Sequence, residues 1–142
     1  SAHRPGDRPM ALDFRTIGLT ALVETGGRIV VNPGTDAVLL PRPAVAALAQ
    51  GDEWLPAWRD EDLRELLLAD AAAACPAIVD VEIAYAGDGL TRVLVSVDRA
   101  SFAQGADASA MKETLSAALN ALGSNPRLIA SADRVEIAPV LR

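Results

Sequence analysis

The sequence predicts an α+β domain in which two helices cover one face of a small sheet, and three observations support this prediction. Apolar residues recur at helical spacing over residues 60–75 and again over 107–123. Two runs of alternating polarity, residues 79–85 and 92–98, flank a glycine-rich turn and predict an antiparallel hairpin. A third alternating run, residues 135–138, follows the second helix. With one further strand ahead of the first helix, this order gives the split β-α-β layout of ferredoxin-like folds.

The chain is expected to begin with a disordered leader, residues 1–14, which shows no apolar periodicity. The only histidine, His3, lies in this leader, so we expect no imidazole for general-base or zinc chemistry. A two-residue alternation over residues 17–31, with Gly26-Gly27 inside it, predicts an N-terminal β-hairpin that extends the sheet. The alternative is that this hairpin pairs with a second copy of the chain by β-augmentation.

The N-terminal segment, residues 15–51, is expected to continue with a turn, a strand and a helix, and a connector follows it. Pro43 suits the first turn of a helix, and Gly51 suits its end. Large aromatic residues in a connector commonly pin it to the core. The expected elements are a turn at residues 32–35, a strand at 37–40, a helix at 43–51, and a connector at 52–59 that contains Trp54 and Trp58.

The main α+β domain is expected over residues 60–142, or over 38–142 if the short strand joins its sheet. The first helix is expected to begin at Asp60 or Asp62, where acidic residues cap it, and Cys75-Pro76 ends it. The loop Gly87-Asp88-Gly89 then fixes the register of the hairpin. This register pairs Ile83 with Val93, Val81 with Val95 and Val79 with Val97, and the predicted core joins these six residues to Leu66, Leu67, Leu115 and Leu119.

The last helix and strand complete the domain. Asp107 is expected to cap the helix, and Gly123 is expected to end it in a left-handed conformation. The final strand turns Val135 and Ile137 inward. Pro139 indicates that this strand ends there or lies at an edge of the sheet, because proline has no N–H to donate.

Composition and charge argue against several classes of function. The 142 residues carry a net charge of -6 and contain no cluster of Lys and Arg, so neither nucleic acid nor an anionic membrane is an expected partner. The single cysteine, Cys75, allows no internal disulfide, which fits a cytoplasmic protein. The longest uncharged run, residues 71–79, is too short to span a bilayer.

One surface stands out as a candidate for binding. Strand side chains that point away from the two helices are expected to form a free sheet face, with Leu94 at its apolar centre. The candidate residues of this face are Glu82, Ala84, Arg92, Leu94 and Ala138. No residue is assigned a catalytic, cofactor-binding or metal-ligating role, and no cofactor is expected.

Two parts of the chain carry a family resemblance. Residues 29–35 read Ile-Val-Val-Asn-Pro-Gly-Thr, and Leu39-Leu40-Pro41 and residues 44–51 follow them. This part resembles the end of the N-terminal domain of SseB-like proteins, the bacterial enhanced-serine-sensitivity family. The helix, hairpin and helix that come next, together with residues 135–140, are similar to the C-terminal domain of that family. The chain is too short for a complete first domain, and the resemblance implies no reaction, only a link in name to serine sensitivity and to secretion.

The favoured functional hypothesis is a non-catalytic protein-interaction or assembly module that binds a protein partner or self-associates through its free face or an edge. The alternative is a regulatory domain that binds a small ligand, with the amino acid serine as the candidate. An enzyme is a third class, and it would need carboxylate or lysine chemistry because the only histidine lies in the leader.

Overall fold

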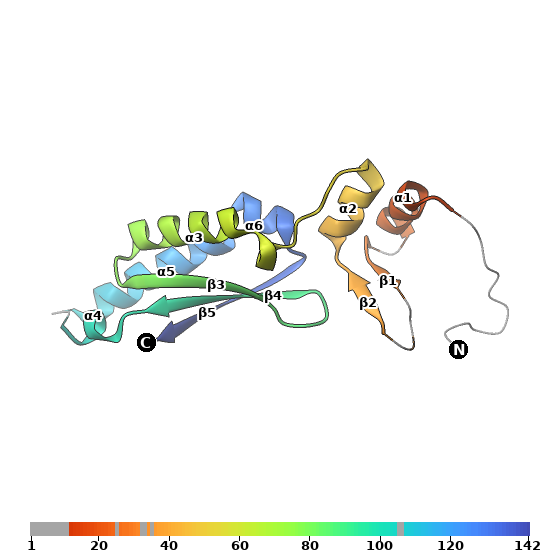
Figure 1. The fold of residues 1–142 in the computed structure, drawn as a ribbon. Helices are drawn as coiled ribbons and strands as arrows, with labels where there is room; N and C mark the ends of the chain where they lie inside the picture. Colours follow the sequence, from red (N-terminus) through yellow and green to blue (C-terminus); the bar gives the residue numbers. More distant parts are fainter. Residues whose placement is uncertain (1–11, 25, 32–33, 35, 105–106) are drawn as a thin grey trace. The chain divides into compact units, whose positions relative to one another are not determined.

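The computed structural model describes residues 12–24, 26–31, 34, 36–104 and 107–142. It divides into two compact units, Ser1–Trp54 and Leu55–Arg142, and each unit is described by itself (Figure 1). The boundary between the units falls inside the connector that contains the two tryptophans. Most of the predicted leader and of the turn at residues 32–35 lies outside the described residues.

The described residues of the first unit form two helices and a short antiparallel hairpin. The two strands pair with each other, with Val30 opposite Leu39. Its elements are α1 (Phe14–Glu24), β1 (Ile29–Val31), β2 (Val38–Leu40) and α2 (Arg42–Gln50). The predicted strand at residues 37–40 and the predicted helix that ends at Gly51 are confirmed, and Gly51 takes the left-handed conformation, with φ of 77°, that ends α2.

The predicted hairpin over residues 17–31 is wrong, because most of this stretch forms helix α1. The Asp13 carboxylate accepts a hydrogen bond of 2.8 Å from the backbone N–H of Thr16, which is the bond of a helix N-cap. At the other end, the N–H of Gly27 donates to the carbonyl of Ala21 at 2.9 Å, so the chain folds back onto a carbonyl in the last part of the helix. Gly26 and Gly27 do have positive φ, but they end a helix instead of turning a hairpin.

The second unit is a three-stranded sheet covered by helices. Its strand order is β3-β4-β5, in which β3 and β4 are antiparallel and β4 and β5 are parallel. Figure 1 shows α3, α5 and α6 on the same side of this sheet. The elements are η1 (Ala57–Arg59), α3 (Glu61–Ala74), β3 (Ile78–Tyr85), β4 (Leu90–Val97), α4 (Arg99–Gln104), α5 (Ala108–Gly123), α6 (Pro126–Ser131) and β5 (Arg134–Leu141).

This architecture confirms the α+β class but not the ferredoxin-like topology. The two candidates for a first strand, β1 and β2, pair only with each other and do not join the β3-β4-β5 sheet. In the described part of the chain the sheet therefore has three strands, and its parallel pair is formed by β4 and β5 across the helical connection between them. Helices α4 and α6 were not predicted from the sequence.

The predicted hairpin register is confirmed over most of its length and wrong at one end. Ile83 pairs with Val93 and Val81 with Val95, around the predicted loop at residues 87–89. A β-bulge then shifts the register between Ile78 and Asp80, so that Ile78, not Val79, pairs with Val97. Because a bulge inserts one extra residue into a strand, Val79 turns out of the core and is 55% exposed, whereas Ile78 is buried.

The hydrophobic core lies between the sheet and the helices. Leu63, Leu67 and Ala71 of α3 are buried, but Leu66 lies toward the side of the helix and is 39% exposed, so its assignment to the core is wrong. Leu115 and Leu119 of α5 are partly buried against the core. The other predicted members, Val81, Ile83, Val93, Val95, Val97 and Leu67, are buried.

The predicted start of α5 is confirmed, but its predicted end is wrong in detail. Asp107 accepts hydrogen bonds from the N–H groups of Ser109 and Ala110. Gly123 is the last residue of the helix and has no left-handed φ, and the helix is capped by Ser124 with φ of -97°. The chain turns directly into α6, whose own N-cap, Asn125, stands immediately after Ser124.

Candidate interaction face

The five predicted face residues lie together on the side of the sheet that the helices of this unit leave open (Figure 1). Glu82, Leu94 and Ala138 form one row across the three strands, and Ala84, Arg92 and Glu136 form the next. Paired residues of neighbouring strands point to the same side of a sheet. We call this surface the open face, and it consists of Asp80, Glu82, Ala84, Arg92, Leu94, Ser96, Glu136, Ala138 and Val140.

The centre of the open face is apolar and moderately accessible. Leu94, Ala84, Ala138 and Val140 are all partly buried. Leu94 is therefore neither a fully exposed side chain nor a member of the core. Ser96 is 4% exposed between its strand neighbours. The apolar surface available to a partner is consequently small and ringed by charged side chains.

Two ion pairs and one unpaired carboxylate surround this apolar centre. Nε and Nη2 of Arg92 donate to Oε2 of Glu136 at 3.1 and 3.0 Å across strands β4 and β5. Asp80 pairs with Nη1 of Arg64 at 3.3 Å. Glu82, directly opposite Leu94 on β3, has no ion pair or hydrogen bond to another side chain among the described residues.

The edge of the sheet at β3 is covered by Arg64 of α3. Its Nη1 lies 3.5 Å from the carbonyl oxygen of Val81 as well as beside Asp80. Glu61, one turn earlier, accepts a hydrogen bond of 2.7 Å from Nε of Arg64, and this bond holds the pKa of Glu61 below its usual value. The same bond raises the pKa of Arg64. The guanidinium is therefore anchored over the strand, and with the nearby bulge it obstructs pairing with another strand.

The opposite edge, at β5, is interrupted by Pro139. The N–H of Arg142 donates to the carbonyl of Val97 at 2.9 Å, so the even-numbered residues of β5 bond to β4. Odd-numbered residues, including Pro139, then direct their backbone groups to the outer edge. Because proline has no N–H, the predicted placement of Pro139 at an edge is confirmed, and the outer edge lacks a donor in the middle of the strand.

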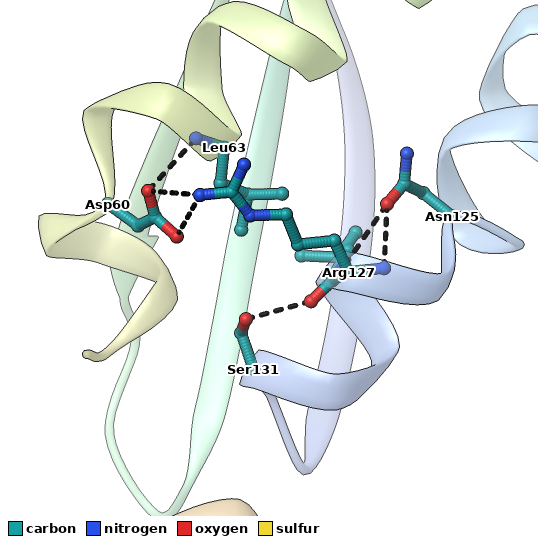
Figure 2. A network of polar contacts seen from close by, with 6 residues as sticks. Asp60, Leu63, Asn125, Arg127 and Ser131 are labelled. Carbon is teal, nitrogen blue, oxygen red and sulfur yellow. Dashed lines mark hydrogen bonds and ion pairs between the residues drawn. The ribbon is translucent and has the colours of Figure 1, made fainter. Parts of the chain in front are cut away.

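A network of polar contacts around the buried carboxylate of Asp60 links α3 to α6, as Figure 2 shows. Asp60, which is 8% exposed, accepts a hydrogen bond of 3.0 Å from the N–H of Leu63 and so caps α3, which is the first of the two predicted starts of this helix. Both of its carboxylate oxygens also lie 3.0 Å from Nη2 of Arg127 in α6. Asn125 caps α6 by accepting from the N–H groups of Arg127 and Leu128. The acidic residues at 60–62 predicted a helix start, but no local signal predicted the ion pair of Asp60 with a residue 67 positions away.

The first unit contains an apolar groove between α1 and β1. Its cavity volume is about 310 Å³, and among the lining residues that the structure describes, only Thr20 and Arg28 have polar side chains. The other lining residues are Leu12, Ile17, Ala21, Ile29 and Val30. Sequence reasoning missed this groove because it depends on α1 being a helix, although the N-cap signal of Asp13 was present.

Trp58 packs against the core of the second unit. Its ring centroid lies 4.8 Å from that of Tyr85 on β3, with an angle of 39° between the planes.

Among the described residues, no group of three or more His, Cys, Asp or Glu side chains is placed to hold a metal ion. None of the described helices combines the length and apolar character needed to cross a bilayer.

No protein-family model, curated protein or solved structure matches this chain. The resemblance to SseB-like proteins therefore stays a prediction from the sequence.

Proposed function

We propose that this chain is a non-catalytic protein-interaction or assembly module that binds its partner through the open face. One observation carries the proposal: the helices of the second unit cover a single side of its sheet, and the other side presents Leu94 among charged residues (Figure 1). An apolar centre with a polar rim is the usual composition of a protein interface.

Both edges of the sheet have features that obstruct pairing with another strand, so the open face is the more suitable binding surface. A partner strand that adds to β3 meets the bulge at Val79 and the guanidinium of Arg64. A strand that adds to β5 finds no donor at Pro139. Such features are the ones by which natural sheets prevent edge pairing.

The size of the apolar centre points to a transient partner. Leu94 is partly buried by its own strand neighbours, so little apolar area is gained on binding. Permanent interfaces bury large and more hydrophobic surfaces, whereas transient ones are smaller and more polar. In line with the resemblance stated above, we propose an SseB-like module of the bacterial cytoplasm, where a chain with the single cysteine Cys75 needs no disulfide.

The alternative function, binding of a small regulatory ligand, is favoured by the apolar groove of the first unit. Serine is a poor chemical match to this groove, since its ammonium group needs acceptors and the described lining residues include no carboxylate. A saturable rise of the melting temperature with serine, among the common amino acids, would support this alternative. We expect no such rise.

The proposal is tested by replacing Leu94 with Asp and measuring both melting temperature and mass in solution. A partly buried side chain on an open face tolerates the charge, so the melting temperature is expected to stay within a few degrees of the parent. Self-association or partner binding is expected to be lost. A large fall in melting temperature would instead place Leu94 in the core, and the open-face proposal would have to be dropped. Val79→Asp, at an exposed valine of β3, is the matched control.

A further inference from the structure

We propose that the partner of the open face is an amphipathic helix that carries Lys or Arg beside its apolar stripe. This inference rests on the proposed function and names the chemistry of the partner. It follows from the one carboxylate on this face that has no counter-charge, Glu82, and from its position next to Leu94.

Among the described residues, one carboxylate of the open face has no ion-pair partner. Glu136 is matched by Arg92, and Asp80 is matched by Arg64. Glu82 forms no ion pair among the described residues, and it lies directly across from Leu94; Arg92, one row away on the same face, pairs with Glu136 instead. A partner that covers Leu94 also removes water from Glu82, and an unpaired carboxylate is costly to desolvate. The partner must therefore bring a cation together with its apolar side chain.

The spacing between these two groups matches a helix. Side chains that face each other on neighbouring strands have Cβ atoms roughly 5 Å apart. Residues three or four positions apart on a helix are separated by about 5 to 6 Å. An apolar residue over Leu94 and a Lys or Arg one turn away over Glu82 satisfy both contacts at once.

A second copy of the chain fits this surface poorly. If two open faces pack about a two-fold axis across the strands through Leu94, each Glu82 faces the Glu82 of its copy. If the axis runs along the strands, Glu82 faces Ala138. A crossed packing brings Glu82 toward Arg92, which already pairs with Glu136. The net charge of -6 also makes two copies repel each other and favours a basic partner.

The test uses the full chain, labelled with ¹⁵N, and two synthetic helical peptides of fourteen residues. Both peptides carry the same leucine stripe, and one has Lys where the other has Glu at the positions beside the stripe. With the lysine peptide, the amide signals of Glu82, Leu94 and Ala138 are expected to shift saturably, and the affinity is expected to fall as salt rises. The glutamate peptide is expected to leave these signals in place.

Variants separate this inference from the proposed function. Glu82→Gln is expected to weaken the lysine peptide about two- to fivefold, the range for one accessible ion pair. Glu82→Lys is expected to reverse the preference to the glutamate peptide. Glu113→Gln, which removes one carboxylate from α5, is the matched control and is expected to leave the affinity unchanged.

Each remaining outcome tests either the basic partner or the open face as a binding surface. Equal binding of both peptides, or no effect of Glu82→Gln, would overturn the basic partner while leaving the open face as a binding surface. Absence of any shift with either peptide would also overturn the basic partner, and the proposed function would then depend on the mass measurement with Leu94→Asp. Loss of binding to both peptides in Leu94→Asp, with the fold retained, supports the face itself.

Discussion

Asp60 is the residue that links two helices of the second unit. It caps α3 through Leu63 and pairs with Arg127 of α6, and its carboxylate is buried. Removing this side chain leaves a helix N–H and a guanidinium without their acceptor. The cap stabilises the start of α3, and the ion pair with Arg127 connects α3 to α6. Asp60 therefore contributes to tertiary structure as well as to its own helix.

Replacing Asp60 with Ala is expected to lower the free energy of unfolding by about 2 to 3 kcal/mol, because a cap and a buried acceptor are both lost. Asp60→Asn keeps a capping oxygen and is expected to cost about 1 kcal/mol. Urea denaturation followed by circular dichroism measures both. Asp62→Ala, an exposed acid in the same helical turn, is the control. Equal effects at positions 60 and 62 would refute the network.

A second prediction at this scale concerns the pKa of Asp98. Hydrogen bonds from the hydroxyl and the N–H of Ser101, at 2.7 and 3.0 Å, favour the charged carboxylate and lower the pKa of Asp98 from the ordinary value of 3.8. This stabilisation is present above the ordinary pKa and is lost as the pH falls through the lowered one. A carboxyl NMR titration is expected to show the shift, and Ser101→Ala is expected to reduce it. An unchanged titration in Ser101→Ala would contradict this assignment.

At the scale of elements, strand β3 shows what sequence periodicity misses. The alternation of valine and isoleucine predicts the correct face for Val81 and Ile83, but it cannot reveal the extra residue of a bulge. Helix α1 shows that apolar residues in a helix can also fit the two-residue period of a strand. Ile17, Leu19 and Val23 fit a two-residue period, yet the Asp13 cap and the glycine pair after the helix are helix signals.

The bulge gives a paired prediction within one strand. Val81→Ala removes methyl groups from a fully buried side chain and is expected to cost about 1 to 3 kcal/mol. Val79→Ala, at a side chain 55% exposed, is expected to cost less than about 0.5 kcal/mol. Chemical denaturation of both variants is the measurement. Similar losses at the two positions would mean that Val79 is in the core and that the unbulged register is correct.

At the scale of the molecule, local signals predicted more of the second unit than of the first. Its long helices have acid caps at Asp60 and Asp107, and its hairpin has a loop with three positive φ values at residues 87–89. Which strands share a sheet depends on long-range pairing, so the parallel β4-β5 pair and the separate β1-β2 hairpin were not predictable from periodicity. The five residues of the candidate face were predictable because strand alternation alone places them.

The second unit is expected to fold without the first. Every residue of its hydrophobic core cluster lies between Ala57 and Ala132. A fragment of residues 55–142 should therefore unfold cooperatively and reproduce the amide NMR spectrum that these residues give in the whole chain. A fragment without dispersed signals would show that the core needs contacts from residues 1–54.

The proposal that the open face binds a partner requires that position 94 is accessible in the free protein. Thiol labelling measures this accessibility, and the single natural cysteine does not interfere with it. Cys75 is fully buried, so a neutral maleimide is expected to label it only through unfolding. A thiol introduced by Leu94→Cys is expected to react on the order of 100-fold faster or more than one introduced by Val95→Cys, because position 94 is only partly buried on the open face whereas Val95 is fully buried in the core. Labelling of position 94 as slow as that of position 95 would show that the open face is covered in the free protein, which is incompatible with its proposed role as a binding surface.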